Sequence, residues 1–504
     1  MGGSAMQLKD VNGVDVIVVG AGNAAMCAAL AARDMGARVI VLEKAPQAEC
    51  GGNSAFTGGA TRFAFNNVED LREVIDISED EARNADFGSY TEADFLDDMG
   101  RVTQYRCDPD LTETLVRNSR QVMAWMKNKG VRFEAMYGRQ AHKVDDKFKF
   151  FGGMVCAFWG AGAGLVESLH RIVKQAEIPV LYETSAISLL YENGRVTGVV
   201  AESAGHNHDI KAGAVVLACG GFESNAEMRA RYLGPNWDLA KVRGTRFNTG
   251  GGLNMALNVG AMPCGHWSGC HAVGWDMNAP AFGEREVGDQ FQKHSYPFGI
   301  MVNANGERFV DEGADFRNYT YAKYGVEVLK QPGMFAWQIF DSKVSHLLRT
   351  EYRIRQITKA EAQTMEELAD KLEGVDKKRF LETVSAYNRA VSRDIPFNSV
   401  IKDGRGTTGL AIPKSNWANT LDEPPFHAYA ITCGVTFTFG GVKISLRGAV
   451  QNVSGRDIPG LYAAGEMVGG LFYFNYPGGT GLMAGSVFGK IAGTSAGQRA
   501  KQQP

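Results

Sequence analysis

The chain has 504 residues, which is beyond the size at which one hydrophobic core keeps growing, so we expect two or three domains. Apolar residues make up 44% and charged residues 22%, as in an ordinary globular protein, and this composition excludes a disordered chain. The 53 Lys and Arg residues against 56 Asp and Glu residues give a formal net charge of -3, and no basic stripe stands out. We therefore expect no nucleic-acid partner.

No apolar run is long enough to span a bilayer, and the opening Met1–Met6 lacks the pattern of a secretion signal, so no direct membrane span is predicted. The eight cysteines are irregularly spaced and include no C-x-x-C pair. We therefore predict no metal site and no disulfide framework, and we expect a cytoplasmic location.

Glycine is the residue type that departs from the average. The chain holds 61 glycines, which is about 12%, against a usual level of roughly 7%. The glycines gather at the ends of apolar runs, where they let backbone approach a ligand closely. This distribution indicates one large ligand that is contacted many times.

The first sixty residues predict a dinucleotide site. A β-branched run at 14–19 predicts a buried strand, an alanine-rich helix follows to about residue 35, and 38–43 predicts a second parallel strand. The turn reads G-x-G-x-x-A with Gly20, Gly22 and Ala25, and Glu43 closes the second strand. In such a unit the glycines admit a pyrophosphate at the helix N-terminus and the acid accepts bonds from ribose hydroxyls. The alternative is a purely structural strand–helix–strand unit.

A second glycine and hydroxyl loop at 50–59 favours FAD over a nicotinamide nucleotide, because FAD needs further donors for its second phosphate and its ring. Together with the blocks at 215–222, 249–252 and 460–466, the chain resembles the flavoproteins of the fumarate reductase and succinate dehydrogenase family over nearly its whole length. The resemblance implies an α/β fold. A discontinuous Rossmann-like FAD-binding domain (12–265 and 428–504) would carry an inserted α+β capping domain (266–427).

The resemblance also implies which residues contact the cofactor. It implies non-covalent FAD, because no histidine lies between Glu43 and Arg62, where succinate dehydrogenases attach the flavin. The expected cofactor-binding residues are Gly20, Gly22, Asn23, Ala24, Glu43, Lys44, Gly52, Asn53, Ser54, Thr57, Gly58, Gly59, Ala186, Ala218, Gly220, Gly221, Thr249, Gly250, Gly252, Gly465, Glu466, Gly481 and Leu482. Gly251 departs from the family, which normally carries Asp at that position.

A second glycine-rich turn at 160–164 offers an alternative. Glu183 follows Gly160 at the same interval as Glu43 follows Gly20, which would suit a second nucleotide fold for NAD(P)H. The preceding residues have little β-branched character, and 180–201 with Asn193-Gly194 at its middle predicts a β-hairpin instead of a crossover. We therefore favour a helix that feeds a hairpin of the FAD domain.

The third region, roughly 266–427, would supply the reaction chemistry, and it includes two expected helices at about 359–373 and 376–391. By resemblance, Arg317 takes the place of the family's arginine acid/base, one residue later than in fumarate reductases, and His271 that of its carboxylate-binding histidine. Because the pKa of arginine is above about 12, we expect Glu312 or Asp315 to relay the proton. The alternative is a surface arginine paired with Asp315.

Two departures weaken a plain fumarate or succinate activity. Phe437 stands where fumarate reductases have a substrate histidine, and Tyr476 stands where they have a carboxylate-clamping arginine. The Tyr-Pro-Gly sequence resembles that of ketosteroid dehydrogenases, in which the tyrosine polarises a ketone. The runs 312–325 and 469–482 resemble tricarballylate dehydrogenases more closely. These oxidise propane-1,2,3-tricarboxylate to cis-aconitate and pass electrons to a separate iron–sulfur membrane protein.

We therefore predict an FAD-dependent oxidoreductase that acts on CH–CH groups of a small polycarboxylate. Arg317 would remove a proton while flavin N5 accepts a hydride. Tyr476 and His271 are the further catalytic candidates, and Arg62, Arg246 and Tyr319 the substrate-binding candidates. An iron–sulfur or quinone-linked protein is the expected electron acceptor. A ketone desaturase, a fumarate-reductase-like enzyme and a non-catalytic flavin electron carrier remain alternatives.

Overall fold

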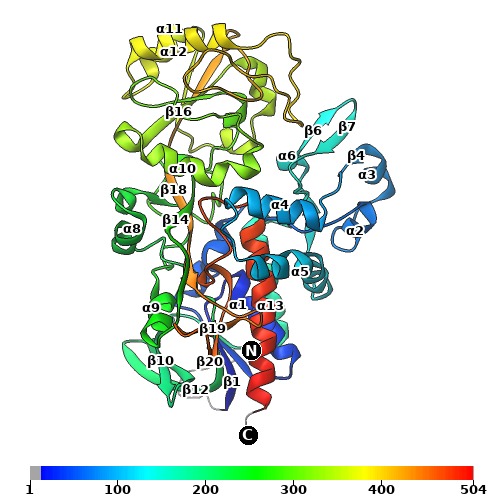
Figure 1. The fold of residues 1–504 in the computed structure, drawn as a ribbon, viewed down its shortest axis with the longest axis vertical. Coiled ribbons are helices and arrows are strands. Elements are labelled where there is room, and N and C mark those ends of the chain that lie inside the picture. The colour runs from blue at the N-terminus through cyan, green and yellow to red at the C-terminus, as the bar shows by residue number, and fades with distance from the viewer. Residues whose placement is uncertain (1–12, 503–504) are drawn as a thin grey trace.

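The structure, a computed structural model, describes residues 13–502. The opening Met1–Met6, and residue 12, where the FAD-binding domain is predicted to begin, lie outside the described residues. In Figure 1 the first and last parts of the chain form most of the lower half, and the yellow-green to yellow segment with β16, α11 and α12 forms the top.

An eight-stranded sheet forms the centre of the lower half, and its main path has the order β10-β11-β12-β1-β2-β9. The strands are β1 (Val14–Val19), β2 (Val39–Leu42), β9 (Val180–Leu181), β10 (Thr184–Glu192), β11 (Arg195–Ser203), β12 (His206–Leu217), β19 (Ala449–Gln451) and β20 (Asp457–Ala463). β1 is parallel to both β2 and β12, and its apolar side chains from Val16 to Val19 are buried. The predicted strand–helix–strand unit is confirmed.

Two helices of small residues cover this sheet side by side, α1 (Asn23–Asp34) and α13 (Thr480–Lys501), although they come from opposite ends of the chain (Figure 1). A Cβ on Gly489 would lie 2.5 Å from Ala24 O, and one on Gly493 would lie 2.1 Å from Ala28 O. Glycine therefore sets the distance between the two backbones. This contact brings the C-terminal segment back onto the first turn of the nucleotide site.

The segment around the second glycine-rich turn does not form a second nucleotide fold. β8 (Cys156–Phe158) is antiparallel to β3 (Ala60–Thr61) and β5 (Phe133–Ala135) in a separate sheet, whereas β9 belongs to the main sheet. The helix between them, α7 (Ala161–Gln175), leads to the hairpin of β10 and β11 with Asn193-Gly194 at its turn. The predicted hairpin is confirmed for residues 184–203, whereas Val180–Leu181, predicted as its start, form β9, which is parallel to β2.

A further region, coloured blue to cyan in Figure 1, extends from the lower half beside the upper one. It contains α2 (Val68–Arg72), α3 (Glu79–Asn84), α4 (Glu92–Val102), α5 (Pro109–Asn128), α6 (Tyr137–Gln140), β4 (Ala85–Asp86), β6 (Ala141–Val144) and β7 (Lys147–Phe150). Its importance for the site lies in α4 and α6.

Two long antiparallel strands, β14 (Pro263–Asp276) and β18 (Phe426–Val442), lead to the upper half, and we call residues 277–425 between them the cap segment. They share a six-stranded sheet with β13 (Lys241–Val242), β15 (Ile300–Val302), β16 (Phe335–Phe340) and β17 (Lys359–Ala362). The helices nearby are α8 (Ala226–Leu233) and α9 (Gly251–Asn258), with α10 (Tyr321–Leu329), α11 (Met365–Lys371) and α12 (Lys377–Ala390) in the cap segment. The predicted domain boundaries after 265 and 427 fall inside β14 and β18 and stay a prediction.

The helix expected at about 359–373 is wrong in its first part. Residues Lys359–Ala362 form β17, which pairs with β18, and the helix begins only after Thr364. The hydroxyl of Thr364 accepts a hydrogen bond from the amide of Glu367 at 3.1 Å and caps the helix. An edge position on the sheet thus outweighs the helix propensity of the Lys-Ala-Glu-Ala run.

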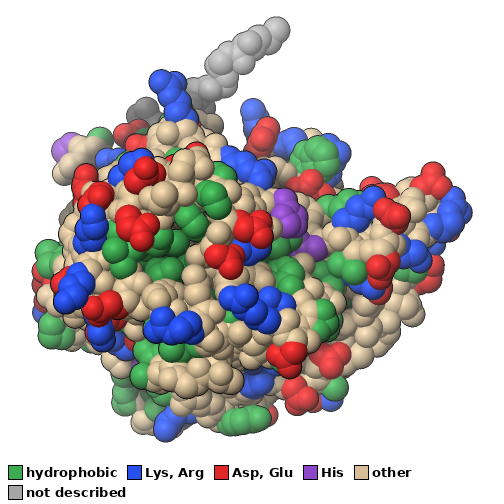
Figure 2. Space-filling view, turned by 90° about the horizontal axis from the view of Figure 1, so that it is seen from above, with side chains coloured by type: hydrophobic (Ala, Val, Ile, Leu, Met, Phe, Trp, Pro, Cys, Tyr) green, Lys and Arg blue, Asp and Glu red, His purple; other side chains and the backbone are tan. Residues whose placement is uncertain are grey.

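The surface seen from above the cap segment carries interspersed acidic and basic side chains (Figure 2). Within residues 13–502, no helix combines the length and the apolar character that crossing a membrane requires.

Candidate active site

One cavity runs from the ends of β1 and β2, at Gly20 and Glu43, to Arg317 and Arg349 in the cap segment. We call it the central cavity. Its lower end is built on the turn after β1. A Cβ on Gly20, whose φ is +105°, would lie 2.4 Å from Ala218 O, so only glycine fits there.

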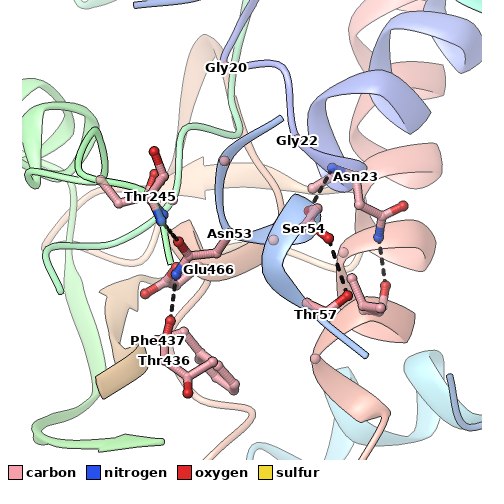
Figure 3. Close-up of a pocket in the computed structure, with 18 of the residues that line it drawn as sticks. Gly20, Gly22, Asn23, Asn53, Ser54, Thr57, Thr245, Thr436, Phe437 and Glu466 are labelled. Carbon is pink, nitrogen blue, oxygen red and sulfur yellow. Dashed lines mark hydrogen bonds between the residues drawn. The ribbon is translucent and has the colours of Figure 1, made fainter. Parts of the chain in front are cut away.

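The N-terminus of α1 opens into the cavity (Figure 3). Gly22 precedes the helix and provides no side-chain cap, and the amide of Asn23 donates to Ser54 Oγ at 3.0 Å. An added Cβ on Gly22 would lie 3.3 Å from both Ser54 Oγ and Gly51 O. The helix thus presents amides and its positive dipole end to the space between the two glycine loops, where a phosphate would sit.

The end of β2 supplies an acid. Glu43 is 7% exposed, and its Oε1 accepts a hydrogen bond from the amide of Ala45 at 2.7 Å. Burial raises the pKa of the Glu43 carboxyl. Beside it, Lys44 Nζ donates to Thr249 Oγ1 at 2.9 Å, which ties this wall to the loop before α9.

The second glycine loop is held in place by Asn53. The Asn53 side chain donates to Thr436 O at 2.5 Å and accepts from the amide of Thr245 at 2.9 Å (Figure 3). It also donates to Glu223 Oε1 at 2.7 Å. These bonds use both donors of the amide and one lone pair of its oxygen. Asn53 lines the cavity, and its side chain holds the second glycine loop in place through these bonds.

The structure places every predicted cofactor residue on the wall of the central cavity except Gly59, Gly221 and Gly250. These three lie directly behind the wall. A Cβ on Gly59 would lie 2.6 Å from Ala161 Cα, one on Gly221 would lie 2.1 Å from Glu466 Oε1, and one on Gly250 would lie 2.4 Å from Met228 Sδ. They allow close packing of the wall. The glycine turns, the open helix end and Glu43 together fit an extended dinucleotide such as FAD.

The upper end of the cavity has an aromatic wall around His271. The ring centroids of Tyr321, Phe437 and Tyr476 lie 5.0, 5.2 and 4.8 Å from that of His271. The hydroxyls of Tyr321 and Tyr476 hydrogen-bond to each other. Burial raises the pKa of both phenols, so they stay protonated and act as donors.

His271 is 1% exposed, and neither of its ring nitrogens has a hydrogen-bond partner among the described residues. Burial, with the nearby Arg243 guanidinium, holds the pKa of His271 well below its usual range. The ring is therefore neutral, with one donor and one acceptor nitrogen unused by the protein. Because buried polar atoms are rarely left without a partner, these atoms indicate a ligand.

Arginines also line this end of the cavity. The four that line the cavity are Arg139, Arg243, Arg317 and Arg349. Arg139 binds Asp289 through two bonds of 3.0 and 3.1 Å, and Arg243 Nη2 lies 3.6 Å from Asp289 Oδ2. Arg349 Nε lies 3.0 Å from Glu351 Oε1, while Arg349 Nη1 is buried without a hydrogen bond. At this end of the cavity, within the described residues, four guanidinium groups thus face the carboxylates of Asp289 and Glu351 and keep an excess of positive charge.

Arg317 projects into the cavity from the start of the cap-segment turn Arg317–Tyr319. Its Nη2 donates to Arg139 O at 2.8 Å and also bonds Gln140 Oε1. Burial, followed by the charge of Arg349, lowers the pKa of Arg317 to about 9. That is close enough to neutrality for a minor fraction of the guanidine to be deprotonated.

The carboxylate relay predicted for Arg317 is wrong. Glu312 is engaged by Arg308 in a fully buried ion pair. Asp315 pairs with Arg101 at 2.6 Å and with Lys402 at 3.8 Å, so the predicted alternative of an Arg317–Asp315 surface pair does not form either. Both carboxylates are paired with other cations.

Three predicted substrate-binding residues do not line the cavity. Arg62 is fully buried and donates its Nε to Gly478 O at 2.8 Å and its Nη2 to Gly152 O at 3.1 Å. Tyr319 donates to Asp98 Oδ2 at 2.6 Å, outside the cavity. Arg246 points into solvent, with 62% of its side chain exposed, and lies 3.6 Å from Glu49. Each of these polar side chains has a partner from a distant part of the chain, and that partner cannot be identified from the sequence.

Sequence reasoning also missed much of the upper end. Arg139, Arg243 and Arg349 lie in separate parts of the chain and have no common motif. Two further residues at this end, His294 and Tyr321, lie in segments that the sequence analysis did assign to the reaction chemistry. His294, whose Nε2 is buried without a partner, stands in the histidine-containing region, and Tyr321 stands in the run that carries Arg317.

The fold and the cavity together define a flavoprotein oxidoreductase. Residues 15–482 match the family described as FAD binding domain. The fumarate reductase (cytochrome) of Shewanella frigidimarina is 29% identical over 492 residues, which cover 97% of this chain and 78% of that protein.

Solved structures give the same result. The open conformation of a flavocytochrome c3 fumarate reductase has a TM-score of 0.71 and 25% identity, over 97% of this chain and 78% of that one. A 3-ketosteroid Δ1-dehydrogenase from Sterolibacterium denitrificans has a TM-score of 0.74 and 22% identity, over 98% of this chain and all of that one, which shows a shared fold.

The chain therefore belongs to the FAD binding domain family, and fumarate reductases are among the proteins to which it is similar. It is an FAD-dependent oxidoreductase that acts on CH–CH groups.

Proposed function

We propose that this enzyme oxidises a small polycarboxylate, of which tricarballylate, converted to cis-aconitate, is the best example. The supporting observation is the excess of guanidinium groups at the upper end of the central cavity. Burying four arginines against two carboxylates is costly unless a ligand supplies further negative charge. A tricarboxylate supplies three carboxylates, each able to accept bidentate bonds from a guanidinium.

The roles of the side chains follow from their protonation states. Arg317, with its lowered pKa, takes the proton from one carbon of the bond that is oxidised. The glycine turns of the lower end would hold FAD without a covalent link, and the cofactor would supply the acceptor for the hydride of the adjacent carbon. His271 and Tyr476 donate hydrogen bonds to substrate carboxylates, since both stay neutral in the cavity.

A ketone desaturase is the second candidate. The paired hydroxyls of Tyr321 and Tyr476 could polarise a carbonyl oxygen, and Phe437 and Phe472 offer an apolar surface beside them. A neutral cyclic ketone would supply no negative charge beyond the two carboxylates that already face the four arginines. The polycarboxylate therefore explains more of the site.

The electron acceptor and the location are proposals as well. The relative from Shewanella is named for a cytochrome, and one structural neighbour is a quinol-fumarate reductase. We propose a separate iron–sulfur or quinone-linked protein as the acceptor, and a cytoplasmic location.

Anaerobic mixing of the purified enzyme with tricarballylate tests the proposal. We expect loss of the oxidised flavin absorbance and one cis-aconitate for each flavin reduced. A 3-ketosteroid serves as the comparison compound and should leave the flavin oxidised. Bleaching by the ketone and by none of the carboxylates would transfer the assignment to the desaturase.

A further inference from the structure

The turn that carries Arg317 is bonded to parts of the molecule outside the cap segment. Arg317 itself donates to Arg139 O at 2.8 Å, and Asn318 Nδ2 donates to Gly152 O at 3.2 Å. Phe316 stacks on Phe151, with ring centroids 5.5 Å apart. The cap segment therefore contacts the α6–β7 region through three consecutive residues.

Asp98 on α4 is the centre of a further contact with this turn, made through Tyr319. Its Oδ2 accepts hydrogen bonds from Tyr319 at 2.6 Å and from Tyr90 at 2.7 Å, and its Oδ1 accepts from Arg101 Nη2 at 2.7 Å. The buried Arg62 lies 3.7 Å from Asp98 and donates to the Tyr319 hydroxyl at 3.3 Å. The carboxylate is thus almost fully coordinated, and Tyr319 is its connection to the cap segment.

The same turn is held from the opposite side by the loop that carries Tyr476. Asn475 Nδ2 donates to Tyr319 O at 2.6 Å, and the amide of Gly478 donates to Asn318 O at 2.8 Å. Arg62 donates to Gly478 O and so links the two sides. Arg317 and Tyr476 are therefore fixed relative to each other by bonds that neither side chain makes itself.

We propose that Tyr319 and Asp98 are positioning residues that hold Arg317 in register with Tyr476 and the reacting bond. This inference rests on the proposed role of Arg317 in proton removal. Proton transfer has a strict geometric requirement, because the donor and acceptor atoms must lie within hydrogen-bond distance. A displacement of about 1 Å lowers the rate by the order of a hundredfold. The proposal also accounts for Arg62 and Tyr319, the two predicted substrate-binding residues that contact each other and Asp98 outside the cavity.

The chain offers a matched pair of variants. Tyr319→Phe and Tyr90→Phe each remove one buried hydroxyl from the same Asp98 oxygen. Only Tyr319 belongs to the turn that carries Arg317. Comparing the two separates positioning of Arg317 from a general weakening of the Asp98 cluster.

The first measurement is hydrogen exchange of the holoenzyme, which needs no substrate. The amides of Tyr319 and Thr320 donate within the turn, at 2.9 Å to Phe316 O and at 3.1 Å to Arg317 O. We expect Tyr319→Phe to speed exchange at residues 316–320 by about tenfold, and Tyr90→Phe to leave it unchanged. Equal exchange in the two variants would overturn the anchoring of the turn.

The second measurement is the rate of flavin reduction at saturating tricarballylate. We expect a loss of about tenfold or more in Tyr319→Phe, with KM within about threefold of the wild type, and a change below about twofold in Tyr90→Phe. A raised KM with an unchanged rate would instead make Tyr319 a substrate-binding residue and overturn the proposal. Wild-type enzyme that no polycarboxylate reduces would refute the proposed function, and the exchange result would still decide the anchoring.

If Tyr319→Phe does not fold, Arg101→Gln provides a milder test. It removes the half-exposed arginine that pairs with both Asp98 and Asp315. Arg120→Gln on α5 removes a similarly exposed arginine of an ion pair elsewhere. We expect a rate loss of about threefold for the first variant and none for the second. Equal rates in the two would count against the proposal.

Discussion

The lower and upper ends of the central cavity are built by different means. The lower end is made of backbone, with glycine turns and a helix N-terminus that a few consecutive residues form. The upper end is made of side chains, with four arginines from four separate parts of the chain. A backbone site depends on local conformation, whereas a side-chain site depends on tertiary contacts. The two ends should therefore respond differently to substitution.

The largest effect is expected at the upper end. Arg317→Ala should lower the rate of flavin reduction by about a thousandfold, because it removes the group that takes the proton, and it should leave the FAD content unchanged. Anaerobic stopped-flow absorbance and the flavin-to-protein ratio measure the two quantities. A rate within about tenfold of the wild type would remove Arg317 from this role.

The pH dependence should follow the same residue. Arg317 must be deprotonated to accept a proton, and its pKa of about 9 leaves roughly 1% of the free base at pH 7. The value of kcat/KM should therefore rise about tenfold per pH unit from pH 7 and level off near pH 9. Activity is thus lost as the pH falls. A profile that is flat between pH 7 and 9 would contradict the assignment.

A smaller effect is expected from Arg349, whose Nη1 has no hydrogen bond to any of the described residues. Arg349→Gln should raise KM for tricarballylate about thirtyfold and change kcat less, because a charge-assisted hydrogen bond is lost. Arg246→Gln is the matched control, since Arg246 is exposed and outside the cavity, and it should change neither constant. Steady-state kinetics of both variants give the comparison, and similar KM values would place Arg349 outside the substrate site.

The same contrast explains what could be predicted from the sequence. The first strand–helix–strand unit and the glycine wall were predictable, because each depends on spacing within a few residues. The hairpin at Asn193-Gly194 was predictable for the same reason. The partners of Arg62, Tyr319 and Asp315 were not, because those contacts join residues more than 200 positions apart. A charged residue near a motif shows its chemistry but not the direction in which its side chain points.

The smallest predicted effect tests the lower end. Gly22 and Gly251 both line the cavity with φ values that other residues adopt, yet a Cβ on Gly22 would lie 3.3 Å from Ser54 Oγ, while one on Gly251 meets nothing within 4 Å. Gly22→Ala should therefore weaken FAD binding by about tenfold, because the methyl group occupies the approach to the helix N-terminus. Gly251→Ala should bind FAD as the wild type does. Titration of the two apoproteins with FAD, followed by flavin fluorescence, measures both affinities. Equal affinities would show that close backbone approach at Gly22 does not control binding, and that the side chains around Glu43 hold the nucleotide instead.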